Sequence, residues 1–180
     1  MSAQGGILVF SENQNLAREL LSKARQVADA QGLSVSMALL GESVPAEGAE
    51  YVLWNVDTIC TVQSPLLKDF NPEAYTTALA GVIDRQQPAL VLVGASKFGL
   101  EVSARLAERL NAGCASWCVD FDVDAESKIV TTQCMVFSGQ GITTYKIHTQ
   151  PALATVSPGV FEAVDGAARD VSILPLDVEI

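Results

Sequence analysis

Hydrophobic and polar positions follow two alternating periods along the first 110 residues. Short, mainly apolar runs occur at 7–10, 35–40, 59–62 and 89–93, the last of them unbroken, and such runs are typical of strands buried on both faces of a parallel sheet. Between these runs, apolar residues recur every three or four positions, which indicates helices with one apolar face. The order predicts an α/β sheet whose parallel strands are joined by right-handed crossovers.

Residues that favour helix ends bracket the predicted helices. Ser11 or Asn13 can cap the first helix, and Gly32 ends it. Asn71 followed by Pro72 begins the second helix. The positions predicted to be buried are Leu16, Leu20, Ala24, Val27 and Ala28 in the first helix, Tyr75, Leu79, Val82 and Ile83 in the second, and Val102, Leu106 and Leu110 in the third.

The segment 41–55 is compatible with two structures. A short helix could begin near Pro45, or Tyr51–Trp54 could form a strand. We favour the helix, because 59–62 is the better third strand and two parallel strands need a crossover between them.

After Asn111 the pattern becomes strand-like. Apolar or alternating runs occur at 119–124, 129–137, 142–147 and 153–156, and Ser138–Gly141 forms a turn. Since no helix-length segment separates these runs, we expect them to pair partly antiparallel or to cover the sheet edge. The fold class is therefore α/β, a three-layer α/β/α arrangement with a mainly parallel sheet and extra strands in the C-terminal third.

Composition and charge exclude several classes of partner. The chain has 180 residues, 49% of them hydrophobic, and a net charge of −10, so nucleic acid and anionic membranes would repel it. No apolar run approaches the ~20 residues needed to cross a bilayer, and the N-terminus has no basic segment. We expect a cytoplasmic protein without membrane insertion, divided into a domain over 1–164 and a C-terminal linker or strand extension over 165–180.

The turn after the strand at 89–93 is the candidate ligand site. In it, Gly94, Ser96 and Gly99 lie between the carboxyl end of a strand and a helix N-terminus, where free N–H groups can bind a nucleotide phosphate. A tight turn without a ligand explains the same residues. The turn lacks the patterns of a nucleophile elbow and of a P-loop. Glu12, just after the first strand, could line the same crevice.

Other chemistry-bearing residues give no catalytic or metal site. The only histidine, His148, lies in a strand pattern, and a strand face explains the acidic alternation at 120–124. The four cysteines contain no CxxC pair, so a zinc site is excluded and buried thiols are expected. The alternative is a redox-sensing pair of Cys114 and Cys118.

Four segments, in order, resemble the N-terminal domain of the electron-transfer flavoprotein alpha subunit. They are ILVFSENQN at 7–15, LLSKARQVADAQG at 20–32, VLVGASKFGLEVSARLAERLNAGCAS at 91–116 and PALATVSPGVFEAV at 151–164. The third resembles the hallmark of that family, although Leu100-Glu101 stands where the family has Arg-Asp. Ser157 stands where that family has an arginine before the closing Pro-Gly.

This resemblance implies an electron-carrier component rather than an enzyme. It implies a scaffold that forms a heterodimer with a beta-type subunit, with a largely apolar patch on one sheet edge. FAD belongs to the full complex and is held mainly by a separate C-terminal domain, for which this chain has no matching positions. The chain could be a fragment or a stand-alone protein.

Two other functions stay open. The family fold is similar to that of its AMP-holding beta partner, an adenine-nucleotide alpha-hydrolase-like fold, so a stand-alone adenine-nucleotide-binding domain that holds AMP at the Gly94–Gly99 turn is the alternative. A small hydrolase that uses Ser96 or a cysteine ranks last, because no base is paired with either nucleophile.

Overall fold

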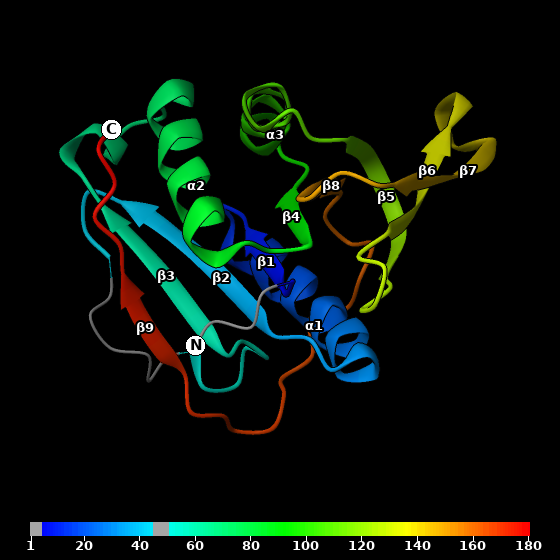
Figure 1. Ribbon diagram of the computed structural model, residues 1–180, viewed down its shortest axis with the longest axis horizontal. Helices are drawn as coiled ribbons and strands as arrows, with labels where there is room; N and C mark the ends of the chain where they lie inside the picture. The colour runs from blue at the N-terminus through cyan, green and yellow to red at the C-terminus, as the bar shows by residue number, and fades with distance from the viewer. Residues whose placement is uncertain (1–4, 45–50) are drawn as a thin grey trace.

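The computed structural model describes residues 5–44 and 51–180, which form one nine-stranded sheet with helices on both faces (Figure 1). The strands are β1 Ile7–Phe10, β2 Val35–Gly41, β3 Thr58–Gln63, β4 Leu90–Gly94, β5 Cys114–Val123, β6 Val130–Val136, β7 Gly141–Ile147, β8 Ala152–Val156 and β9 Ser172–Pro175. The helices are α1 Gln14–Gln31, α2 Pro72–Gln86 and α3 Lys97–Leu110, with short 3-10 turns η2 Pro65–Leu67 and η3 Phe137–Gly139.

The strand order is β7-β6-β5-β8-β4-β1-β2-β3-β9. All neighbours from β5 to β9 in this order are parallel, whereas β5–β6 and β6–β7 are antiparallel. The predicted fold class, a mainly parallel sheet with extra strands in the C-terminal third, is confirmed.

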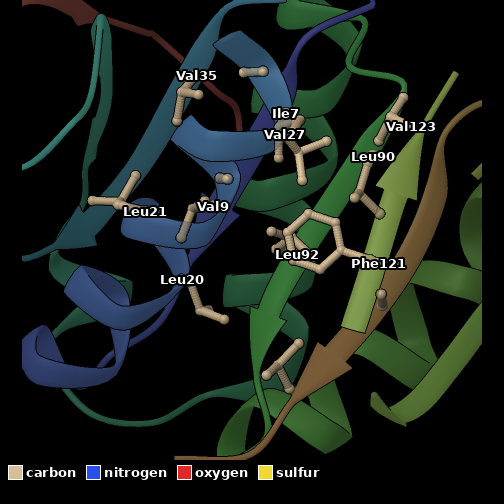
Figure 2. Close-up of a cluster of buried hydrophobic side chains, with 14 of the residues drawn as sticks. Ile7, Val9, Leu20, Leu21, Val27, Val35, Leu90, Leu92, Phe121 and Val123 are labelled. Carbon is tan, nitrogen blue, oxygen red and sulfur yellow. The ribbon is translucent and has the colours of Figure 1, made fainter. Parts of the chain in front are cut away.

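Alternate residues of the central strands enter two separate cores. Ile7 and Val9 pack against α1 on one face, as Figure 2 shows. Leu8 and Phe10 pack against residues of α2 and α3 on the other face. This period of two makes the fold three-layered. None of the described helices is long and apolar enough to cross a membrane.

The predicted helix caps are confirmed. The Asn13 side chain accepts hydrogen bonds from the first turn of α1, and Gly32 ends that helix at a φ of 66°. Asn71 caps α2 in the same way, with Pro72 in the first turn. The predicted apolar faces are buried at every position except Tyr75 and Leu110, which are half-buried.

The segment between β2 and β3 is described only in part. Tyr51–Trp54 lies in tight turns, so the alternative that made it a strand is wrong. The favoured helix near Pro45 falls mostly on residues 45–50, outside the described residues.

β8 enters the sheet between β4 and β5, and β5 carries a bulge where it pairs with β8. The register of β5 against β8 shifts between Ala115 and Cys118, and Trp117 adopts a φ of 60° there. Just before β5, the Gly113 N–H donates to the Thr149 hydroxyl at 2.7 Å. This hydrogen bond joins the start of β5 to the short link between β7 and β8. The bulge also leaves Val119 only half-buried, which breaks the predicted alternation.

The C-terminal segment extends the sheet on its other edge. β9 pairs in parallel with β3, and the partly buried side chains of Leu176, Val178 and Ile180 pack against the core beneath α2 and α3.

A charged cluster joins α1 to the loop before β3. The buried guanidinium of Arg25 donates to both carboxylate oxygens of Asp57 at 3.0 and 2.8 Å and to the Leu33 carbonyl at 2.9 Å. Asp57 also accepts from the Val35 N–H at 2.8 Å, and Arg169 from the C-terminal segment lies 3.5 Å away. One carboxylate thus connects four parts of the chain.

The substitution Asp57→Ala should lower the free energy of unfolding by about 2–4 kcal/mol, because it leaves the Arg25 charge buried without its main partner. Urea unfolding followed by circular dichroism measures the loss. The matched control is Glu126→Ala at an exposed turn, which should stay within about 0.5 kcal/mol of the unmodified protein. Equal stability of the two variants would contradict the role of this cluster.

Candidate functional site

The carboxyl ends of β1 and β4 form the point at which the strand order reverses. The chain leaves β1 toward β2, but it leaves β4 in the opposite direction across the sheet. Ligands in open α/β sheets usually bind in the crevice at this point. A Cβ atom added to Gly94 would lie 2.6 Å from the Ser11 hydroxyl and 2.6 Å from Leu16, so the turns after the two strands are in contact.

The structure brings the predicted site residues Gly94, Ser96 and Gly99 together in one closed turn. The Ser96 N–H donates to the Gly94 carbonyl at 2.9 Å, and the Ser96 hydroxyl accepts from the Gly99 N–H at 2.9 Å. A Cβ atom on Gly99 would lie 1.9 Å from the Gly94 carbonyl oxygen. The residues that would hold a phosphate therefore bond to one another.

Aromatic rings lie on the α2 and α3 side of the same crevice. The centroid of the Phe98 ring lies 6.2 Å from that of Phe10, 4.8 Å from that of Tyr75 and 3.9 Å from that of Phe70. Burial and the nearby charge of Glu12 raise the pKa of Tyr75, so the exposed Glu12 does border this region. These rings come from three separate segments, so no local pattern in the sequence indicated the cluster.

The remaining candidates do not gather into a catalytic or metal site. Within the described ranges, no group of three or more His, Cys, Asp or Glu side chains could hold a metal ion. His148 is exposed just after β7. Asp120 pairs with Lys23 at 2.7 Å, and hydrogen bonds from Ser127 lower the pKa of Asp124.

Three of the four thiols are buried. Cys60, Cys118 and Cys134 have no appreciable exposure, whereas Cys114 is exposed. Burial raises the pKa of Cys60 to about 12, which keeps this thiol protonated and unreactive.

A groove of about 550 Å³ lies inside the curl of β5, β6 and β7. Its lining includes Cys114, Cys134, Tyr145, Ile147 and His148. Reasoning from the sequence missed this groove, because its lining comes from three strands and the link after β7, which are separate segments of the chain.

Large exposed apolar side chains gather on the β6–β7 hairpin, residues 130–147. Phe137 is 82% exposed at its tip and Ile142 is 64% exposed. Met135, paired with Ile142 in the register, and Tyr145 are also exposed, and Trp117 adds to them from β5.

The substitution Gly99→Ala should lower the free energy of unfolding by about 1–3 kcal/mol, because its methyl group would overlap the Gly94 carbonyl oxygen. The gain in helix propensity offsets at most about 1 kcal/mol. Thermal unfolding measures the change. Lys97→Ala, at an exposed position in the same turn, is the control and should be near neutral; equal effects would contradict the close approach.

Known proteins match this chain over most of its length. The family model described as electron transfer flavoprotein domain matches residues 7–179. The chain is 29% identical over 181 residues to the electron transfer flavoprotein subunit alpha of Thermoanaerobacterium thermosaccharolyticum, covering 97% of this chain and 54% of that protein. It is 32% identical over 146 residues to the protein FixB of Azorhizobium caulinodans, covering 79% and 39%.

A further relative, the electron transfer flavoprotein subunit alpha of Clostridium acetobutylicum, is 28% identical over 173 residues, or 93% of this chain and 52% of that protein. The chain thus spans about half the length of such relatives. The family match covers every strand and helix of the structure, from β1 through β9. The chain belongs to the electron transfer flavoprotein domain family.

Proposed function

We propose that this chain is an alpha-subunit-type scaffold domain of an electron carrier that assembles with a beta-type subunit. In this proposal FAD belongs to the full complex and is held mainly by a separate FAD-binding domain, so this chain alone carries no flavin. Electron transfer, rather than catalysis of a substrate reaction, is the activity of the assembly. Membership of the family and the names of the relatives support it.

The observation that carries the proposal is the apolar surface of the β6–β7 hairpin. Phe137 and Ile142 expose most of their side chains there, and exposed apolar clusters of this kind mark protein–protein contacts. The resemblance predicted such a patch on one sheet edge, and β7 is the edge strand. A partner that covers the hairpin would remove these side chains from water.

The charge distribution supports the same surface. The chain carries a net charge of −10, yet Lys146 is the only charged side chain in the hairpin, residues 130–147. Charged residues are depleted from the centres of protein interfaces because their desolvation is costly. The acidic remainder of the domain keeps it in solution, while the hairpin is left suited to docking.

The double substitution Phe137→Asp with Ile142→Asp should weaken binding to a beta-type subunit at least about 10-fold, since it places two charges in an apolar interface. Co-expression with a beta-type subunit, followed by size-exclusion chromatography and titration calorimetry, measures the loss. Both positions are exposed, so the variant should fold normally.

Leu66→Asp is the matched control, because Leu66 is an exposed apolar residue on η2 outside the hairpin. It should bind the beta-type subunit like the unmodified chain. An absorbance scan of the isolated chain should show no flavin band. Failure of the unmodified chain to associate with any beta-type subunit would overturn the proposal.

The alternative function is a stand-alone adenine-nucleotide-binding domain that holds AMP at Gly94, Ser96 and Gly99. The position of this turn, at the reversal of the strand order and at the N-terminus of α3, favours it. The internal hydrogen bonds of the turn and the ring of Phe98 oppose it. We rank it second for that reason.

AMP at millimolar concentration separates the two functions. A nucleotide that binds the folded chain would raise the melting temperature by about 2–5 °C through mass action, and Ser96→Ala should reduce that rise. The scaffold proposal predicts no shift. Differential scanning fluorimetry with adenosine as a phosphate-free control measures the difference, and an unchanged melting temperature would discard the alternative.

A further inference from the structure

Two buried thiols face each other at the base of the β6–β7 hairpin. The Sγ atoms of Cys118 on β5 and Cys134 on β6 lie 3.0 Å apart. Cys118 is fully buried and Cys134 is 2% exposed. The sequence suggested Cys114 and Cys118 as a redox pair, but the structure pairs Cys118 with Cys134 instead.

The strand register places this pair where a cross-link fits. Cys118 and Cys134 are directly opposite in the antiparallel ladder, next to the bulge that shifts the register beyond them. Opposed residues of antiparallel strands have Cα atoms about 4.5–5.5 Å apart, within the range of about 4.4–6.8 Å that disulfides span. Closing the bond needs a movement of about 1 Å at the sulfur atoms, since a disulfide measures about 2.05 Å.

The two thiols differ in their position relative to the groove. Cys134 borders the groove inside the curl of β5–β7, whereas Cys118 is not part of its lining; both thiols belong to the buried cluster that contains Phe121 and Val123. Because Cys134 lines the groove and Cys118 does not, Cys134 is the thiol that a small reagent in the groove meets first. Cys114 also borders the groove and is the competing thiol.

We propose that Cys118 and Cys134 are a disulfide-forming pair, which hydrogen peroxide oxidises through the groove. The sulfur of Cys134 attacks one peroxide oxygen, the O–O bond breaks, and the departing hydroxide takes the Cys134 proton as water, which leaves Cys134 as a sulfenic acid. The Cys118 sulfur then attacks the Cys134 sulfur, the S–O bond breaks, and the departing hydroxide takes the Cys118 proton as water. Two thiols and one peroxide thus give one disulfide and two waters, with two electrons passing from sulfur to oxygen.

The cross-link would fasten β5 to β6 at the base of the hairpin. It closes the loop between Cys118 and Cys134 in the unfolded chain, which reduces the entropy of that state. The oxidised protein should therefore melt about 5–10 °C higher than the reduced protein. This inference does not depend on the proposed electron-transfer function.

The experiment uses the full chain with Cys114→Ser, which removes the exposed competing thiol and leaves the buried pair. One equivalent of hydrogen peroxide should remove two hydrogen atoms from the intact mass, and dithiothreitol should restore them. The melting temperature should rise by the amount stated above. Cys114→Ser with Cys134→Ser is the control and should show no such loss.

Peptide mapping of the unmodified chain tests the pairing without any substitution in the core. After oxidation and denaturation, chymotrypsin cuts at Trp117 and separates Cys114 from Cys118. The Cys118 peptide should be joined to the Cys134 peptide. A bridge from Cys114 to Cys134, a dimer linked through Cys114 as the sole product, or oxygen added to Cys134 without a bridge would each overturn the inference.

Discussion

The pairing of β1 with β4 is the contact on which the rest of the structure depends. These strands are far apart in sequence, yet Ile7–Phe10 aligns residue by residue with 90–93, and both are fully buried. Alternate side chains enter the two cores, so both helix layers are anchored on this pair. Because β2 and β3 lie on the other side of β1, the chain must cross back through α2 to reach β4. That reversal creates the crevice at the strand ends.

The crevice is then closed by the chain itself. Gly99 approaches Gly94 too closely for any other residue, Ser96 satisfies an N–H group of the first turn of α3, and Phe98 packs with rings from elsewhere. Surface suited to recognition appears at the far edge of the sheet instead. There β5 is bulged at Trp117, the strands β5 to β7 line the groove, and β6 and β7 present an apolar, nearly uncharged hairpin on an acidic domain.

Much of the fold could be predicted because its signals are local. Caps such as Asn13 and Asn71 act within a single turn, and the burial of short apolar runs follows from the period of their own residues. The site was only partly predictable. The sequence located the turn at Gly94–Gly99, but the residues that close it, such as Phe70, come from segments that carry no shared pattern.

The sequence by itself determined the α/β class, the ends of the helices, the presence of antiparallel strands in the C-terminal third and the family, since each rests on neighbouring residues or on the order of segments. Only the tertiary structure decided that β8 enters between β4 and β5, that β9 pairs with β3 and that Cys118 faces Cys134 rather than Cys114. The physical reason is that these contacts join distant residues, and their register is set by where one strand bulges and bends, which no local period records.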